Sequence, residues 1–231
     1  MQKKHIVILT GAGISAESGL KTFRDSDGLW NGYNVEDVAT PRAFKKNPQL
    51  VLDFYNQRRK DVAAAKPNAA HYGLAELEKD FTVTIITQNI DDLHERAGSS
   101  RVVHLHGEIF KMRSVDNEQA IYEITGDINI GDTDKHGSQL RPFIVWFEEP
   151  VPMMDKAVSL MYNCDLFVVV GTSLQVYPAA SLLHYAPAHL PKYIIDKKIP
   201  AVAGANITFI EKPATEGVTE LKKILLQQKE S

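Results

Sequence analysis

The sequence contains a single cysteine, Cys164, among its 231 residues. One cysteine excludes an intrachain disulfide framework and a metal site built from several thiolates. No apolar stretch is long enough to span a bilayer, and the apolar run after the polar start of the chain is too short for the core of a signal peptide. We therefore expect a cytoplasmic protein that does not contact a membrane.

The chain also lacks a strong excess of charge of either sign. Its formal net charge is −3, with 24% charged and 44% hydrophobic residues. This balance is that of an ordinary soluble globular protein. It gives no electrostatic reason to expect direct nucleic-acid binding.

Short apolar runs alternate with segments of helical periodicity along most of the chain. The expected strands are residues 5–9, 82–86, 143–147, 166–170 and 193–195. The expected helices are residues 50–64, 69–78, 153–162, 178–185 and 216–228. Continuous apolar strands separated by helices predict an α/β fold, a Rossmann-like doubly wound parallel sheet.

Two segments interrupt this alternation. Residues 20–43 are mixed in character and predict a long ordered loop, whereas residues 114–139 are polar and predict a small inserted domain. We expect one catalytic domain over residues 1–231. Its large Rossmann-like part covers about 1–20, 80–110 and 141–231, and its insertions cover about 21–79 and 111–140.

A glycine motif follows the first expected strand. Residues 11–16, GAGISA, fit the pattern G-x-G-x-x-G/A, in which Gly11 permits a tight turn and Gly13 lets the backbone approach a pyrophosphate. A plain glycine turn is the alternative. A dehydrogenase would show a second strand ending in an acidic residue about 20 residues on. The long loop stands there instead, so we expect a dinucleotide bound in another manner.

Polar residues follow two further expected strands. Gln88, Asn89 and Asp91 stand just after the run 82–86, where ligands of open α/β sheets bind. A capped turn between strand and helix is the alternative. His106 stands beside a glycine after Val102 and Val103 and is a candidate general base, although a lone histidine is more often structural.

These motifs together resemble the signature blocks of the sirtuin family. The blocks occur in order as GAGIS at 11–15, TFRD at 22–25, TQNID at 87–91, LHG at 105–107, IVWF at 144–147 and GTSLQVYPA at 171–179. The resemblance runs from about residue 5 to 200. It implies a Rossmann-like domain and a small zinc-binding domain, with NAD and an acylated lysine of a protein substrate meeting in the cleft between them.

The resemblance also implies a reaction. In sirtuins the acyl oxygen attacks the nicotinamide ribose carbon, nicotinamide leaves, and the acyl group passes to ADP-ribose. His106 would be the base, with Asn89 and Asp91 positioning the ribose, water and nicotinamide. The implied NAD-binding residues are Gly11, Ala12, Gly13, Phe23, Arg24, Gln88, Asn89, Asp91, Gly171, Thr172, Ser173 and Asp196. Val145, Trp146 and Phe147 would line the substrate channel, although a core strand is the alternative for this run.

The sequence departs from the family pattern at three places. The family's two CxxC pairs are missing, and residues 114–139 offer one histidine, His136, and several aspartates. Because that set does not suit a tetrahedral structural zinc, we expect NAD as the cofactor and no zinc. We expect this segment to be held by packing of Ile121, Tyr122, Ile124, Ile128 and Ile130. A carboxylate site for a hard cation is the alternative. Glu148 replaces a glycine and Asp196 replaces an asparagine of the family.

Tyr55 and Arg58 bear on the choice of acyl group. They lie three residues apart and share one face of the expected helix 50–64. Arg58 then falls on a core-facing line, which is costly for an unpaired charge. The pair resembles the Tyr-x-x-Arg motif with which class III sirtuins bind a substrate carboxylate. An arginine that reaches solvent or pairs with a nearby acid is the alternative.

The sequence thus predicts an NAD-dependent protein-lysine deacylase that removes acetyl groups, succinyl or malonyl groups, or both. An NAD-dependent protein ADP-ribosyltransferase is the alternative enzyme. A non-catalytic NAD-responsive binding module is the alternative from another class of protein. The presence of His106, Asn89 and Asp91 argues against this last alternative.

Overall fold

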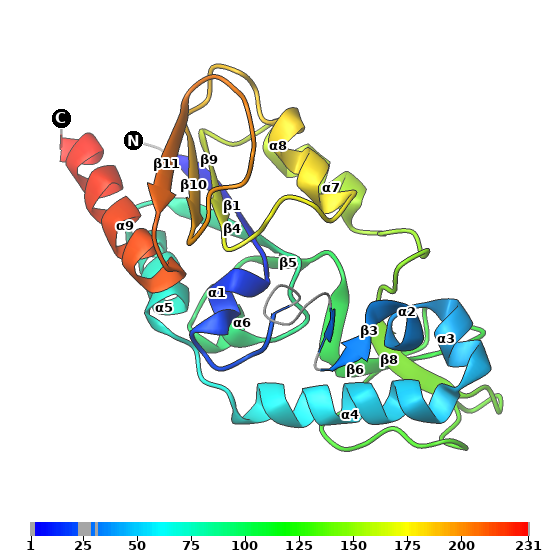
Figure 1. Ribbon diagram of the computed structural model, residues 1–231. Coiled ribbons are helices and arrows are strands. Elements are labelled where there is room, and N and C mark those ends of the chain that lie inside the picture. The colour runs from blue at the N-terminus through cyan, green and yellow to red at the C-terminus, as the bar shows by residue number, and fades with distance from the viewer. Residues whose placement is uncertain (1–2, 23–28, 31, 231) are drawn as a thin grey trace.

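The computed structural model describes residues 3–22, 29–30 and 32–230, and its centre is a six-stranded sheet in the order β11-β10-β9-β1-β4-β5 (Figure 1). The strands are β1 (His5–Thr10), β4 (Thr82–Thr87), β5 (Val102–His104), β9 (Leu166–Val170), β10 (Lys192–Asp196) and β11 (Ile207–Glu211). Every neighbouring pair in the sheet is parallel. The parallel sheet expected from the apolar runs is confirmed.

The order of the strands reverses at β1. From β1 the chain moves to β4 and β5 on one side, and later returns to β9, β10 and β11 on the other. Thr10 at the end of β1 lies opposite Thr87 of β4 and Val170 of β9. The loops that begin at Gly11, Gln88 and Gly171 therefore leave the sheet at the same edge, where ligands of such folds bind.

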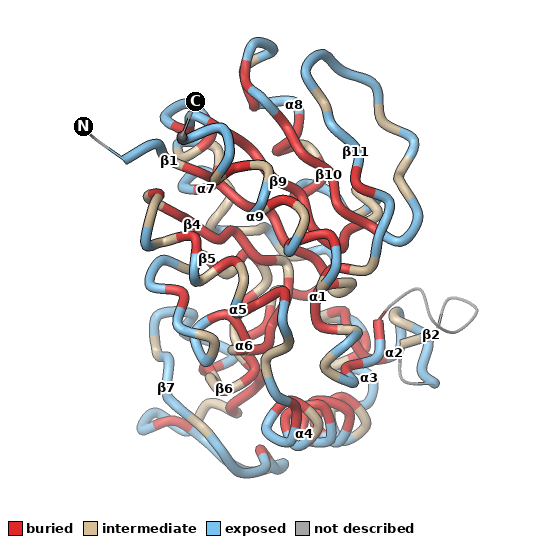
Figure 2. Tube along the Cα trace, turned by 90° about the vertical axis from the view of Figure 1, so that its left-hand side faces the viewer, coloured by how far each residue is buried: buried red, intermediate tan, exposed pale blue. Residues whose placement is uncertain are grey.

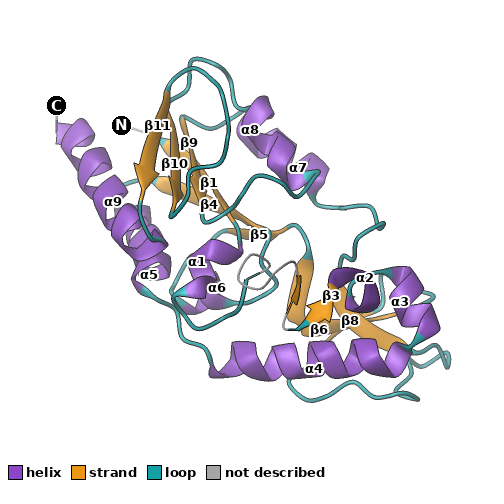
Figure 3. Ribbon diagram, in the orientation of Figure 1, coloured by secondary structure: helices purple, strands orange, loops and turns teal. Residues whose placement is uncertain are grey.

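Helices cover both faces of the sheet (Figure 3). Ile6 and Ile8 of β1 pack with α5 (Ala69–Glu76) and α9 (Ala214–Glu230). Val7 and Leu9 pack with α7 (Met154–Met161) and α8 (Leu182–Tyr185) on the opposite face. Successive strand residues point to opposite faces, so this alternation divides the apolar run between two cores. Each fully buried side chain of this size contributes about 1.5–3 kcal/mol.

A second, smaller group of elements packs beside the sheet. It contains the antiparallel sheet β7-β6-β8 and the long helix α4 (Pro48–Ala64), which begins with the Asn47 side chain accepting from Leu50 N–H at 3.2 Å. Its elements are β2 (Leu29–Trp30), β3 (Tyr33–Asn34), α2 (Val35–Val38), α3 (Pro41–Lys46), β6 (Gly107–Ser114), β7 (Ile121–Glu123) and β8 (Leu140–Ile144). The remaining short helices are α1 (Ala12–Ala16), η1 (Leu77–Lys79), α6 (Leu93–Arg96) and η2 (Ala179–Ser181).

The apolar run 143–147 does not form a strand of the parallel sheet, and that prediction was wrong. The strand here is β8, which pairs antiparallel with β6 and ends at Ile144. Beyond it, Phe147 N–H donates to the Ala39 carbonyl at 3.0 Å, and Trp146 packs in the core around α4. Apolar residues mark burial but do not identify the partner, so the run alone could not separate the two sheets.

The packing expected within residues 114–139 is also largely wrong. Ile128 is fully buried with Leu52 and Leu140, and Ile124 packs against them. Ile121, Tyr122 and Ile130 are exposed, and the tube through β7 is mostly pale blue in Figure 2. The segment contains too few inward positions to bury all five side chains, because all three residues of β7 are exposed, on both sides of the strand.

Other parts of the chain were missed for a related reason. β11 lies at the edge of the sheet, and only its Ile210 is buried. An edge strand needs few apolar residues, so its sequence has no continuous apolar run by which to predict it. Residues 29–30 and 33–43 contain β2, β3, α2 and the start of α3, elements too short to show a periodicity. None of the helices in the described ranges is long and apolar enough to cross a bilayer.

Candidate active site

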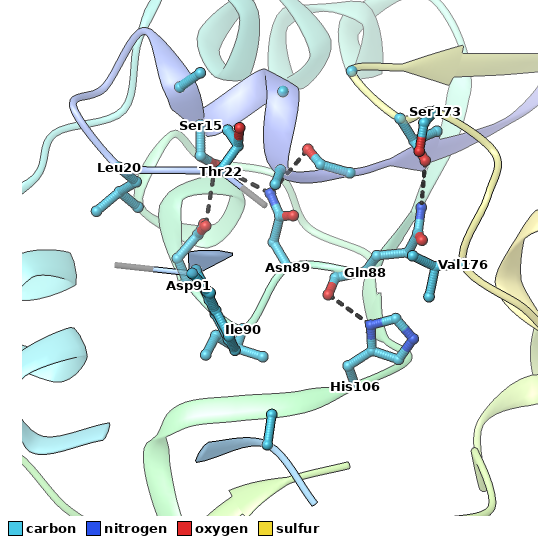
Figure 4. Close-up of a pocket in the computed structure, with 18 of the residues that line it drawn as sticks. Ser15, Leu20, Thr22, Gln88, Asn89, Ile90, Asp91, His106, Ser173 and Val176 are labelled. Atoms are coloured by element: carbon cyan, nitrogen blue, oxygen red, sulfur yellow. Dashed lines mark hydrogen bonds between the residues drawn. The ribbon is translucent and has the colours of Figure 1, made fainter. Parts of the chain in front are cut away.

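A cavity of about 600 Å³ opens at the carboxyl edge of the parallel sheet and extends to the smaller sheet (Figure 4). All the expected site residues within the described ranges line it. These are Gly11, Ala12, Gly13, Tyr55, Arg58, Gln88, Asn89, Asp91, His106, Val145, Trp146, Phe147, Gly171, Thr172, Ser173 and Asp196. Phe23 and Arg24 lie outside the described residues. The fold therefore brings together residues from seven separate segments of the chain.

The glycines at the end of β1 allow two loops to touch. Gly13 N–H donates to the Gly171 carbonyl at 2.8 Å, and a Cβ on Gly13 would lie 2.7 Å from the Gly171 Cα. A Cβ on Gly11 would lie 2.7 Å from the Thr172 Cβ. Gly171 itself has φ 65°, which favours glycine. These contacts give the glycines a packing role beyond the approach to a pyrophosphate expected from the motif.

The polar loop after β4 forms a connected set of hydrogen bonds. Gln88 Nε2 donates to Thr172 Oγ1 at 3.1 Å, which ties this loop to the one after β9. Asn89 Nδ2 donates to Ser15 Oγ at 3.1 Å and to the Gly11 carbonyl at 3.3 Å. The Asn89 amide nitrogen is thus used within the protein, and its amide oxygen remains as an acceptor for a ligand.

Asp91 is held by Ser15 of α1 and by the first residue of α6. Ser15 Oγ donates to Asp91 Oδ2 at 3.0 Å, and Leu93 N–H donates to Asp91 Oδ1 at 3.2 Å (Figure 4). Asp91 is buried, and this burial raises the pKa of its carboxyl group despite the two hydrogen bonds. The sequence placed Ser15 inside the glycine motif but did not identify its contact with Asp91.

A second layer of histidines lies behind these groups, and sequence reasoning missed it. His71 Nδ1 lies 3.2 Å from Asn68 N–H, so the ring accepts there, and its Nε2 lies 3.5 Å from Ser15 Oγ. His94 Nε2 lies 3.0 Å from Thr10 Oγ1. Burial lowers the pKa of His71 to about 4 and that of His94 well below 6.5, so both are neutral. Asn68 and His71 form a capping box at the start of α5, but the contacts of His71 with Ser15 and of His94 with Thr10 join residues distant in sequence, which no local motif reveals.

His106 faces the cavity from the turn between β5 and β6. Its Nδ1 lies 2.9 Å from the Gln88 carbonyl, which can only accept, so Nδ1 carries the proton. In the neutral ring Nε2 then has a free electron pair. Burial lowers the pKa of His106 below 6.5, which favours this neutral form. The arrangement suits a general base.

Tyr55 and Arg58 lie side by side on α4 and are both buried. Arg58 Nη2 donates to the Lys21 carbonyl at 3.2 Å, while its Nε and Nη1 have no hydrogen-bond partner among the described residues. The Trp146 indole N–H acts to lower the pKa of the Tyr55 hydroxyl, but the two groups do not form a hydrogen bond of acceptable geometry. Within the described chain neither group has a hydrogen-bond partner. Burial lowers the pKa of Arg58 and raises that of Tyr55. Such orphaned donors at a cavity suit an anionic ligand.

Residues 145–149 form the opposite wall. Glu149 accepts from Trp146 N–H at 2.8 Å and from Arg141 Nη1 at 2.6 Å. The guanidinium carbon of Arg141 lies 3.2 Å from the Trp146 ring centroid. Trp146 is 2% exposed and Phe147 is 44% exposed, so the wall runs from a buried aromatic face to an open rim.

Glu148, where the family pattern has glycine, has φ 74° and makes a bidentate ion pair with Arg42 at the surface. At the far end of the cavity, Asp196 is buried and its Oδ1 accepts from Lys198 N–H at 3.1 Å. Its carboxylate stands at the carboxyl end of β10, the position expected for a group that binds a ribose.

No group of three or more His, Cys, Asp or Glu side chains with metal-binding geometry occurs within the described ranges. In the segment where the family carries cysteines, Asp134 Oδ1 accepts from His136 N–H at 2.8 Å and from Ser138 N–H at 3.0 Å. A turn closed by hydrogen bonds to a carboxylate therefore holds this segment.

Fold and site together define a dinucleotide-binding α/β protein of the Rossmann-like class. Residues 11–178 match the Sir2 family. A relative from Helicobacter pylori named NAD-dependent protein deacylase is 53% identical, over 97% of this chain and 98% of its own length. A relative of the same name from Bacteroides thetaiotaomicron is 52% identical, over 96% and 98%. The chain belongs to the Sir2 family.

Solved structures agree with this assignment. A Sir2 homologue in complex with NAD has a TM-score of 0.86 and 40% identity, and the match covers 98% of this chain and 91% of the other. The resemblance of the sequence blocks to the sirtuins is thereby confirmed, as is the fold class inferred from the apolar runs.

Proposed function

We propose that this protein is an NAD-dependent protein-lysine deacylase. The observation that supports it best is one cavity lined by the glycine loop after β1, the polar loop after β4 and His106. NAD would lie with its pyrophosphate at Gly11, Ala12 and Gly13 and its adenosine end toward Ser173 and Asp196. When bound, it supplies an electrophilic ribose carbon and a nicotinamide leaving group.

The residues of the chain then have separate tasks. His106, neutral and protonated on Nδ1, would remove a ribose hydroxyl proton with Nε2. Asn89 would offer its amide oxygen, and Asp91 would place negative charge beneath the cleft. Val145, Trp146 and Phe147 would line the channel of the acyl-lysine side chain, and the surrounding apolar surface would exclude water.

The proposal extends to the acyl group. A succinyl or malonyl chain ends in a carboxylate, and Arg58, which lines the cavity, has no hydrogen-bond partner for Nε and Nη1 among the described residues. A planar guanidinium can bind a carboxylate through two parallel hydrogen bonds, and the Tyr55 hydroxyl adds a third donor. We therefore propose removal of succinyl or malonyl groups at least as efficiently as acetyl groups.

Three further parts of the proposal concern cofactors, organisation and location. The small sheet needs no zinc, because the Asp134 turn and the Ile128 core hold it. The large part, about 1–20, 80–110 and 141–231, carries NAD, and the insertions at about 21–79 and 111–140 carry the acyl pocket and small sheet. The partners are acylated proteins of the cytoplasm rather than nucleic acids or membranes.

The deciding experiment is an incubation of the enzyme with NAD and paired acetyl- and succinyl-lysine peptides, followed by mass spectrometry. Formation of nicotinamide and O-acyl-ADP-ribose supports deacylation. Transfer of ADP-ribose to a protein, without loss of the acyl group, would identify the ADP-ribosyltransferase alternative. NAD binding without either product would identify a binding module.

A further inference from the structure

Two histidines contact consecutive carbonyl groups of the polar loop after β4. His106 Nδ1 lies 2.9 Å from the Gln88 oxygen, and His104 Nδ1 lies 3.1 Å from the Asn89 oxygen. Leu105 stands between them, at the bend where β5 ends, and both rings reach the same loop. Both histidines therefore brace the short segment that carries Asn89 and Asp91.

The second ring nitrogen distinguishes the two histidines. His106 lines the cavity, whereas His104 Nε2 lies 2.8 Å from Glu95 Oε1, and the His104 side chain is only 9% exposed. His104 thus meets an acceptor at each nitrogen, the Asn89 carbonyl and the Glu95 carboxylate. A neutral imidazole has one N–H and can satisfy only one of them, whereas an imidazolium satisfies both.

The surroundings of His104 favour the charged form. Burial alone would lower the pKa of His104, but the hydrogen bond and charge of Glu95, the Asn89 carbonyl and the charge of Glu108 raise it above 6.5. Burial alone would raise the pKa of Glu95, but the hydrogen bond and charge of His104, a backbone hydrogen bond and the charge of Lys111 together lower it. Asp91 and His94 also lie within the electrostatic reach of His104.

We propose that His104 is a positioning residue: as an imidazolium held by Glu95, it fixes the Asn89 carbonyl and so holds the loop 88–91 in its active geometry. The inference rests on the proposed deacylase function for its kinetic consequences. Above its pKa, the neutral ring would keep its proton toward Glu95, because a free electron pair facing a carboxylate is repulsive. His104 Nδ1 would then face the Asn89 oxygen without a proton, and the loop would be released.

Activity should therefore depend on pH in two opposite ways. As the pH rises through the lowered pKa of His106, this base is deprotonated and the rate increases. As the pH rises further through the raised pKa of His104, the clamp is deprotonated and the rate decreases. The profile of kcat/KM for NAD should have an alkaline limb that belongs to His104 rather than to a group that contacts substrate.

Four variants test this assignment. In His104→Asn an amide nitrogen can stand near the Nδ1 position and donate to Asn89 without titrating, so activity should be kept and the alkaline limb lost. His104→Leu removes the donor and should lower kcat/KM about ten-fold on the acid side of the alkaline limb, and by less above it, where the wild type has lost the same bond. In Glu95→Gln the amide can donate to neutral His104, so the limb should also disappear. Glu108→Gln, the matched control, removes a nearby charge but no bond to His104 and should keep the limb.

Histidine ¹H–¹⁵N spectra of the free protein give an independent readout. The pKa of His104 should lie above 6.5, and Glu95→Gln should lower it markedly more than Glu108→Gln does. A His104 pKa at or below 6.5, an unchanged alkaline limb in His104→Asn, or wild-type rates in His104→Leu would each overturn the proposal. If the wild type transfers no acyl group, the deacylase proposal fails, while the spectra still decide whether His104 is the charged clamp.

Discussion

The Arg58 guanidinium carbon lies 5.6 Å from the centroid of the Trp30 ring on the wall of the cavity, and no carboxylate of the described residues forms an ion pair with it. The charges that act on Arg58 are those of Asp91 and Asp61, without a hydrogen bond to either. A buried arginine in this state is costly to the free protein and is suited to an anion from outside.

Arg58→Met should therefore separate the acyl substrates. It should lower kcat/KM for succinyl-lysine by about 10- to 150-fold, because a hydrogen bond to a charged group contributes about 1.5–3 kcal/mol. Acetyl-lysine has no carboxylate and should be affected much less. Steady-state kinetics with paired peptides measure the effect. Lys60→Met, which removes an exposed charge from the same helix, is the control.

The same variant has a consequence for stability. Arg58→Met should leave the melting temperature of the free protein unchanged or raise it, because it removes a buried charge with two orphaned N–H groups. Equal losses for both peptides together with a lower melting temperature would show instead that Arg58 is structural.

His106→Ala should reduce kcat by a factor on the order of 10²–10⁴, the usual contribution of a general base, while NAD still binds. Binding measured by calorimetry and turnover measured by nicotinamide release separate the two effects. Because burial lowers the pKa of His106, the wild-type acid limb should lie below pH 6.5, with activity rising as pH rises through it. Turnover at the wild-type rate would exclude His106 as the base.

The purified protein should contain no stoichiometric zinc, and a chelator should leave its melting temperature unchanged. Asp134 holds the turn 134–138 through its hydrogen bonds to two backbone N–H groups, so Asp134→Ala should lower the melting temperature. Glu123→Gln, at an exposed site, should not. Hydrogen bonds from Ser138 and His136 lower the pKa of Asp134. Its stabilising contribution is therefore present above about pH 4 and is lost as pH falls through the lowered pKa. One zinc per chain by elemental analysis would refute this.

Two isoleucines of the small sheet offer a matched comparison. Ile128→Ala should lower the free energy of unfolding by about 2–5 kcal/mol, because it leaves a cavity beside Leu52 and Leu140. Ile130 is 50% exposed, and Ile130→Ala should change it by no more than about 0.5 kcal/mol. Chemical denaturation of both variants measures the difference, and similar losses would contradict the packing described.

The amino-acid sequence determined most of the parallel sheet and the position of the cavity. Continuous apolar runs that are followed closely by Gly11, Gln88 and Gly171 predicted buried parallel strands. Parallel strands place the loops that follow them at one edge of the sheet. These features depend on residues close together in the chain, so a local pattern could reveal them. The Tyr55 and Arg58 pair was visible for the same reason, since a helix brings residues three apart to one face.

Only the tertiary structure decided which distant groups meet. The contacts of His71 with Ser15 and of His104 with Glu95 and Asn89 join segments that no periodicity relates. The partner of the run 143–147 likewise depended on where β6 lies, and Ile121 and Ile130 are exposed because the core around Ile128 does not extend over β7 or over the loop that holds Ile130. Burial of a hydrophobic side chain stabilises the fold, but only the packing in three dimensions decides whether another part of the chain lies close enough to bury it.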